Sequence, residues 1–513
     1  SVDDLVNRPT MTDPVKLAVM NLIINVGAAA YVATPQLFAL MVFKMIHFSL
    51  KYGNTAAAAQ AYATYAVILA GMMGDIEGGY EYSNLAITLL DEYKAENMRA
   101  KVLLTLYGFV RHWKEPYPQT LEPLLEAHRI GLDTGDVSFS AYAITTYMLM
   151  AVVSGVPLTK IQDEAQQAMV VLRQFGQEST INYIILRLQV IANLRGDAYD
   201  DPCMITGELY DEEEGIALYR QTDNLLGMVN IYVNKLQLFY FFHRYQEAAE
   251  IATALKAYEK AGRGTAQIPL INVFTSLSRL ALYPEQSAAA QKETLKIVKA
   301  NQKQLQKWAR FAPENALARY YWIEAERERV LGNGGQAREY YDHALALVRQ
   351  YGALNDEGPL NERMASFYFG RNQKELGNLY LRHAVQAYQE WGAVELLKHL
   401  LTLYPQLELE QRTQIELSDD STIMATNSST QRHVSNTLDW TSIMRVSQAV
   451  SGEIRLDKLL KTMMRTVIEN AGAERGCLIW SENDEWVIEA EGTTTNEAVT
   501  VLQGRPLAEG KVP

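Results

Sequence analysis

Apolar residues recur at helical spacing along most of this chain. From residue 16 to residue 404, Ala, Leu, Gln, Glu, Met and Tyr dominate, and prolines such as Pro116 and Pro202 fall between the apolar stretches. No stretch before residue 470 alternates apolar and polar positions as a strand would. Because a helical region of this length is too long for one globular core, the pattern predicts a mainly α protein built from internal repeats.

A repeated spacing supports this prediction. A turn residue is followed by small or apolar positions at offsets of 2, 5, 9 and 12. The last three positions then share one face of a helix, where small side chains let a partner helix approach closely. We therefore predict helix-turn-helix units. The four sets are Gly74, Ile76, Gly79, Ser83 and Ala86; His243, Tyr245, Ala248, Ala252 and Leu255; Gly332, Gly334, Ala337, Tyr341 and Ala344; and Asn372, Lys374, Gly377, Leu381 and Ala384.

The units resemble the degenerate tetratricopeptide repeat, most clearly in Gly332, Ala337 and Tyr341. The last two units also match each other at an offset of 40 residues. A single unit cannot bury its apolar face, so neighbouring units are expected to stack. We therefore predict a tetratricopeptide-like α-solenoid over residues 1–408, with a concave surface that binds protein partners.

The dipeptide Gly-Asp also recurs, at residues 74, 135 and 196. The spacing is even, but the residues around the three copies do not share a pattern. We therefore give this regularity no weight as a repeat.

The pattern changes after Pro405. Residues 409–438 are rich in Ser, Thr and Asn and predict a flexible linker. A narrow apolar stripe then predicts a signalling and dimerisation helix over residues 439–455, and helical spacing continues to Ile468. We expect a homodimer through the helices of residues 439–468. The stripe consists of Trp440, Ile443, Met444, Ser447 and Val450.

Short apolar runs follow this helical segment. Residues 477–480 and 486–488 flank a polar turn at residues 482–485, which predicts a β-hairpin. Helices followed by the first strands of a sheet indicate that residues 456–513 begin an α+β domain. We expect the chain to be a piece of a longer protein, because this sheet is incomplete and the chain begins at Ser1 rather than at Met.

A long uncharged stretch lies between Lys16 and Lys44. Its length alone would suit a membrane span. However, Asn21 and Asn25 would lack partners in hydrocarbon, and Pro35 divides the stretch into two pieces that are too short to span. We therefore predict a helical hairpin with both helices largely buried, and no membrane span.

Composition and charge narrow the functional classes. The chain has 47 Lys and Arg residues against 60 Asp and Glu residues, a net charge of −13. Because an acidic protein repels a phosphate backbone or an anionic bilayer, we expect no nucleic-acid partner. The two cysteines, Cys203 and Cys477, cannot form a disulfide framework or a thiolate zinc site, and we expect a cytoplasmic protein.

Motifs for catalysis are absent from the sequence. It contains no phosphate-binding loop of the form G-x-x-x-x-G-K-[ST], no G-x-G-x-x-G, no kinase catalytic-loop element and no H-E-x-x-H. The eight histidines form no recognisable ligand pattern. We therefore assign no catalytic residue and no metal ligand, and any residues that bind a cofactor stay unknown.

A few local features suggest a chemical role, but each has a simpler interpretation. The acidic run at residues 211–214 could suggest a metal site, yet consecutive helical residues point around the helix, so we predict a solvated turn or helix start. Cys203 lies in a predicted loop without a basic neighbour in the sequence, and Cys477 is predicted to pack in a core. The His-Trp-Lys sequence at residues 112–114 is predicted to be a packed, capped helix end rather than a cation–π or acid–base site.

Several segments together resemble one family. They are KYGN at residues 51–54, HWK at 112–114, GD at 135–136, VSQAVSGEI at 446–454 and ENAGAERG at 469–476. In this order they resemble the central part of very large bacterial multidomain signalling proteins. The resemblance covers about residues 10–513.

The family implies an order of domains. A serine/threonine kinase domain precedes an AAA-type ATPase module, a long tetratricopeptide-like region, a GAF sensor domain, and a histidine kinase or another output domain. By this resemblance the chain is the helical-repeat region plus the N-terminal part of the GAF domain, residues 456–513. The family's catalytic motifs lie outside the chain, so no catalytic residue carries over, and ATP is expected only in the parent modules. The segments that complete a GAF ligand pocket are also missing, and no cofactor is assigned to this chain.

Together these features predict a protein-interaction and signal-relay region of a two-component signalling kinase. It would lie between an upstream kinase and ATPase module and a GAF sensor with a downstream output domain. The helix at residues 439–455 would carry a rotation or register shift into a parallel dimer. Two alternatives stay open: a stand-alone helical-repeat peptide-binding scaffold, which needs no GAF start, and a helical-repeat transcription regulator, which needs a DNA-reading helix-turn-helix.

Overall fold

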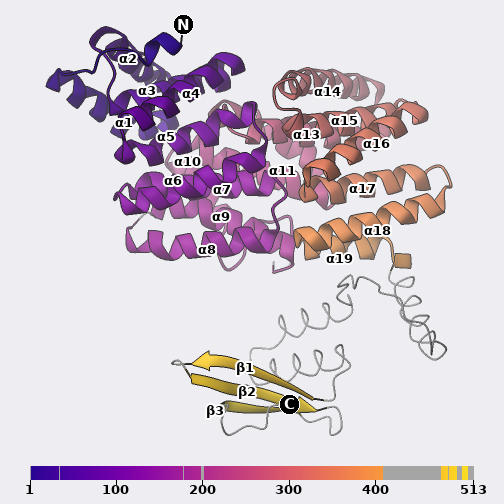
Figure 1. Ribbon diagram of the computed structural model, residues 1–513. Coiled ribbons are helices and arrows are strands. Elements are labelled where there is room, and N and C mark those ends of the chain that lie inside the picture. The colour runs from indigo at the N-terminus through magenta and orange to yellow at the C-terminus, as the bar shows by residue number, and fades with distance from the viewer. Residues whose placement is uncertain are drawn as a thin grey trace, which may run out of the picture. The chain divides into compact units, whose positions relative to one another are not determined.

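The structure of the chain is a computed structural model (Figure 1). It describes residues 2–33, 35–176, 178–197, 201–407, 475–482, 485–493 and 499–506. The chain forms two compact units, Ser1–Ser418 and Asp419–Pro513. The predicted linker, the predicted signalling helix and the helical start of the predicted last domain lie outside the described residues.

The first unit is built from helices. Its described residues form nineteen α-helices and no β-strand, which confirms the mainly α fold expected for this part of the chain. The helices are α1 (Pro14–Ala33), α2 (Pro35–Tyr52), α3 (Ala56–Val67), α4 (Ile76–Glu92), α5 (Glu96–Phe109), α6 (Leu121–Asp133), α7 (Val137–Val153), α8 (Leu158–Gln174), α9 (Glu178–Arg195), α10 (Glu212–Gln221), α11 (Leu225–Phe241), α12 (Tyr245–Leu255), α13 (Gln267–Leu282), α14 (Ala288–Ala309), α15 (Pro313–Val330), α16 (Gly334–Tyr351), α17 (Leu354–Phe369), α18 (Lys374–Trp391) and α19 (Val394–Leu403).

The repeated spacing marks helix starts and buried faces. In all four sets the turn residue has a positive φ, and a helix, namely α4, α12, α16 or α18, begins two residues later. The residues at offsets 5, 9 and 12 are buried in every set. Each of these helices packs against the helix before it, so the predicted helical hairpins are present. The φ angles are 72° at Gly74, 59° at His243, 84° at Gly332 and 59° at Asn372.

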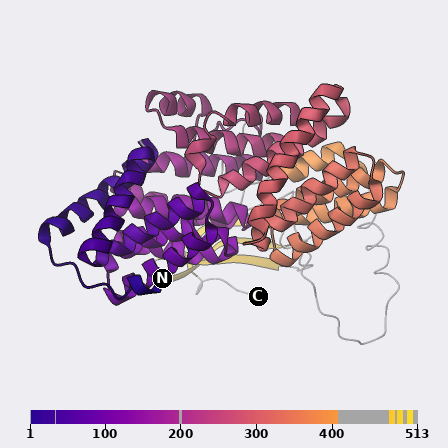
Figure 2. The same ribbon diagram turned by 90° about the horizontal axis from the view of Figure 1, so that it is seen from above.

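Segments about 200 residues apart in the sequence also lie side by side within this unit (Figures 1 and 2). The Asn315 side chain, on α15, donates to the carbonyl oxygens of His112 and Glu115, at 2.7 and 2.8 Å, and accepts from the Tyr117 N–H at 2.9 Å. The rings of Trp113 and Trp308 lie 5.4 Å apart. The repeat spacing predicts only contacts between neighbouring units, so this contact between distant parts of the chain was not foreseen.

The uncharged stretch near the N-terminus forms the predicted hairpin, α1 and α2. The prediction that both helices are largely buried is wrong. One face packs inward, whereas apolar side chains on the other face are exposed, because no described helix covers them. The exposed apolar residues are Val15, Leu22, Val26, Leu37, Leu40, Phe43 and Leu50.

One helical stretch among the described residues, Ala56–Met73, is long and apolar enough to cross a membrane. It lies outside the uncharged stretch considered in the sequence, and 72% of it is buried inside the helical unit. A core helix passes the same test, so this stretch is weak evidence for a membrane span.

The second unit contains a small antiparallel sheet. Strands β1 (Arg475–Glu482), β2 (Glu485–Thr493) and β3 (Val499–Pro506) lie in the order β1-β2-β3. Ile479 pairs with Ile488 and Trp480 with Val487, so the predicted pairing of residues 477–480 with 486–488 is confirmed.

Candidate functional site

A half-enclosed cavity lies among the helices of the first unit. Its volume is about 430 Å³, and residues of α1, α2, α3, α5, α7, α9, α11 and α13 line it. Most of the wall is apolar, because each of these helices turns a hydrophobic face inward. The apolar lining includes Ile24, Phe38, Val42, Met45, Leu104 and Leu149.

A polar cluster interrupts this apolar wall. Arg187, on α9, donates from Nη2 to Asn230 Oδ1, on α11, at 2.7 Å. Gln267 Nε2 donates to the same oxygen at 2.9 Å. The amide nitrogen of Asn230 in turn donates to the Leu226 carbonyl oxygen at 2.9 Å, which fixes the side chain on its own helix.

The charged side chain of Arg187 is buried in this mostly apolar wall. The residue is only 6% exposed, and its Nε has no acceptor among the described residues. Burial lowers the pKa of Arg187 to about 10, and no carboxylate of the described residues offsets this effect. No motif in the sequence predicts a role for this residue. A lone charge within the apolar run of residues 184–190 is the signal that could have found it.

Three threonine hydroxyls of the wall already have hydrogen-bond acceptors. Thr64, Thr145 and Thr146 each donate to a carbonyl oxygen of their own helix, at 2.8 to 2.9 Å.

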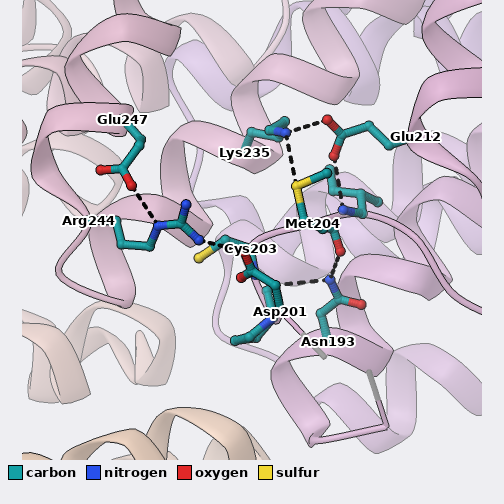
Figure 3. A network of polar contacts seen from close by, with 10 residues as sticks. Asn193, Asp201, Cys203, Met204, Glu212, Lys235, Arg244 and Glu247 are labelled. Carbon is teal, nitrogen blue, oxygen red and sulfur yellow. Dashed lines mark hydrogen bonds and ion pairs between the residues drawn. The ribbon is translucent and has the colours of Figure 1, made fainter. Parts of the chain in front are cut away.

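A second polar network uses α9 and α11 and holds the segment that leads into α10 (Figure 3). Asn193 Nδ2 donates to the carbonyl oxygens of Pro202 and Met204, at 3.1 and 2.6 Å. Glu212 accepts from the Ile205 N–H at 3.0 Å and forms a buried ion pair with Lys235. These bonds satisfy backbone groups of residues 201–205, so the network fixes this loop on the helices.

The acidic run at residues 211–214 is part of this network. The predicted helix start is confirmed, since α10 begins at Glu212 and Asp211 Oδ1 accepts from the Glu214 N–H at 2.9 Å. The predicted solvation does not hold for Glu212, which is 5% exposed and pairs with Lys235. Among the described residues, no group of three or more His, Cys, Asp or Glu side chains could hold a metal ion.

Cys203 lies in the same network but is fully buried. The sequence shows no basic neighbour, whereas the fold brings Arg244 close, where it donates to Asp201 at 2.6 Å and to Glu247 at 2.8 Å (Figure 3). Burial, with Asp201 nearby, raises the pKa of Cys203 to about 12, so the thiol is not a nucleophile at neutral pH. The core position predicted for Cys477 concerns a side chain outside the described part of the structure.

His112, Trp113 and Lys114 lie in another part of the unit. As predicted, they form a packed helix end: α5 ends at Phe109, and a short 3₁₀ turn, Arg111–Trp113, follows. The predicted cap is confirmed, because Trp113 Nε1 donates to the carbonyl oxygen of Phe109, the last residue of α5, at 3.2 Å. The His112 ring is buried against Trp113, with 4.6 Å between the ring centroids, and neither ring nitrogen has a described partner. Burial lowers the pKa of His112 to about 3, which excludes an acid–base role near neutral pH. Lys114 lies at the surface, 4.6 Å from the centre of the Tyr80 ring, in a cation–π contact.

A buried cluster of charged side chains joins the hairpins α15–α16 and α17–α18, and no motif in the sequence predicts it. Glu326, on α15, lies 2.8 Å from Arg329 and 2.8 Å from Arg363, on α17, and accepts a hydrogen bond from the Tyr341 hydroxyl. Burial alone would raise the pKa of Glu326, but the two arginines outweigh it and hold this pKa well below its usual range. Next to this cluster Arg319 Nε donates to Asp356 Oδ2 at 2.7 Å, and both side chains are 4% exposed.

Comparison with known proteins gives one informative similarity. No family model matches the chain. Over 79 residues it is 38% identical to hybrid signal transduction histidine kinase G of Dictyostelium discoideum. This match covers 15% of the chain and spans about 2% of the length of that relative. The similarity supports a relation to signal-transduction proteins.

Proposed function

We propose that this chain is the protein-interaction and signal-relay region of a signalling kinase. Its helical region, residues 1–408, would act between an upstream kinase and ATPase module and a GAF sensor that begins at residue 456. The observation that carries the proposal is the similarity to a histidine kinase.

Two features of the chain agree with this role. Helical hairpins offer side chains on long, mostly rigid surfaces, which suits the binding of protein partners. In addition, a separate unit with an antiparallel sheet follows the helical unit, as a sensor domain would. A stand-alone peptide-binding scaffold would not require this second unit.

The relay would depend on dimerisation through the helices of residues 439–468. Replacing both Ile443 and Met444 by Asp should turn a dimer of the full chain into a monomer, because the two changes place charges in the apolar stripe. Light scattering after size-exclusion chromatography measures this mass. Ser442→Asp, beside the stripe, is the matched control and should leave the dimer intact.

An unchanged mass of the double variant would remove the basis of the relay. A purified chain that hydrolysed ATP or transferred phosphate would contradict the assignment as a whole, because the proposal places all catalysis in other modules. Reading the coding sequence beyond both ends should reveal a phosphate-binding loop upstream and a histidine kinase or other output domain downstream.

A further inference from the structure

The cavity among α1, α2, α5 and α7 combines an apolar interior with one charge. Of the described residues that line it, Arg187 alone is charged. The volume of about 430 Å³ lies within the range of roughly 300–1,000 Å³ in which small-molecule sites are found. The space is therefore suited to an organic molecule rather than to one or two ordered waters.

The charge of Arg187 has no counterpart within the described part of the chain. A guanidinium has five N–H donors, yet its acceptor on Asn230 is an uncharged amide and Nε is buried without an acceptor among the described residues. A buried charge is strongly unfavourable unless an opposite charge and hydrogen bonds compensate it. A bound anion would supply both, since an arginine can bind a carboxylate with two parallel hydrogen bonds.

The lining also limits the kind of anion. A phosphate dianion would need further cations, and Arg187 is the one charged residue among the described residues of the wall. A single carboxylate matches a single arginine, and the apolar walls match an alkyl or aryl body. Because Asn230 Oδ1 accepts from both Arg187 and Gln267, the guanidinium is held in position before any ligand binds.

We propose that this cavity binds a small amphipathic carboxylate, such as a medium-chain fatty acid, with its carboxylate on Arg187 and its apolar chain along α1 and α2. The inference does not depend on the signalling role proposed above, because it rests on the cavity and on the arginine.

The first test is calorimetric titration of the full chain with decanoate, below the concentration at which it forms micelles, and with decan-1-ol as the neutral probe. We expect saturable binding of decanoate. Arg187→Gln should weaken it about tenfold or more, the loss typical of a charged hydrogen-bonded pair, and leave decanol unchanged. Arg173→Gln makes the same change at an exposed position of α8 and should bind as the unaltered chain does.

The second test fills the cavity and keeps the arginine. Gly27, on α1, lines the cavity, and a Cβ built there meets no atom within 4 Å. Gly27→Leu should therefore fold, also because leucine favours a helix more than glycine does. It should weaken both decanoate and decanol about tenfold or more, the effect of removing the space that holds several methylene groups. The matched control is Gly335→Leu, an equally open but exposed position on α16, which should retain both.

Absence of saturable decanoate binding by the folded chain would overturn the proposal, as would binding that Arg187→Gln or Gly27→Leu leaves unchanged. Tighter binding of an apolar peptide with a free C-terminal carboxylate than of decanoate would also overturn it, because the site would then belong to a protein partner. A chain that binds decanoate but does not dimerise would refute the proposed relay and leave the carboxylate site standing. A chain that dimerises but does not bind decanoate would refute the carboxylate site and leave the relay standing.

Discussion

Two regions of the helical unit bury arginine in opposite ways. In the hairpins α15 to α18, Arg319 and Arg363 lie against the carboxylates of Asp356 and Glu326. Arg187, on α9, is 6% exposed and lies against no carboxylate of the described residues, but donates to the amide oxygen of Asn230. The same residue type therefore stabilises packing in one region and indicates a binding site in the other.

The difference has a physical origin. In a buried ion pair the opposite charge compensates the arginine, so no ligand is needed to balance the charge in the folded hairpins. A buried arginine without a carboxylate is maintained by the rest of the fold at a cost in stability. Measurements of stability can separate these two cases, and the largest effect is expected for the paired arginines.

Asp356→Asn should destabilise the chain strongly, because it leaves the charge of Arg319 buried without a partner. We expect a loss of about 3–5 kcal/mol in the free energy of unfolding, measured with urea. Asp342→Asn is the control, since its ion pair with Arg338 is about half exposed and should contribute at most about 1 kcal/mol. Equal losses in the two variants would break the comparison between buried pairs and surface pairs.

His112 is a third kind of buried titratable group, because it is uncharged in the folded chain at neutral pH, whereas the arginines are charged. Its pKa is about 3 in the folded chain, against the usual 6.5. The unfolded chain therefore binds more protons below pH 6.5, so the contribution of His112 to stability is lost as the pH falls from 6.5 toward 3. The expected slope is about 1.4 kcal/mol per pH unit. His112→Phe should reduce the slope of the unfolding free energy against pH between pH 6.5 and 4.5. An unchanged slope would contradict the lowered pKa of His112.

The smallest effect is expected for Arg187. Without added ligand, Arg187→Gln should change the free energy of unfolding by less than about 1 kcal/mol, or raise it, because it removes a buried charge whose hydrogen-bond partner, Asn230, is uncharged. Thermal and urea unfolding in ligand-free buffer measure this. A loss as large as that of Asp356→Asn would mean that Arg187 serves packing, and the contrast between the two regions would disappear.

The helical hairpins could be predicted from the sequence because their signal is local. A turn residue that tolerates a positive φ and three inward positions on the next helix fix both the start and the buried face of a helix. One unit was dismissed too early: Gly135 has a φ of 76°, and α7 begins two residues later. Its inward positions, Ser140, Ile144 and Tyr147, follow the same offsets and are buried. The position at offset 12 is Tyr147 here, whereas the four predicted sets have Ala or Leu there, so this unit does not match their pattern.

Contacts between distant parts of the chain could not be predicted in this way. Glu212 lies in a run of acidic residues that is typical of a solvated surface, and only the fold places Lys235 beside it. The cavity also cannot be predicted from the sequence, because it depends on where eight helices leave space between them unfilled. Arg187 could at most have been noted as a charge in an apolar run. Its missing partner is a property of the folded unit.

The contact of Asn315 with residues 112–117 has a consequence for synthesis of the chain. As the N-terminal half leaves the ribosome, the carbonyl groups of His112 and Glu115 lack their hydrogen-bond donor until some 200 further residues have been made. A linear repeat array can fold step by step from its first unit, whereas here completion of the early hairpins waits for the late ones. Folding of this unit is thereby tied to the arrival of α15, and a nascent chain that stops before it would remain incompletely folded.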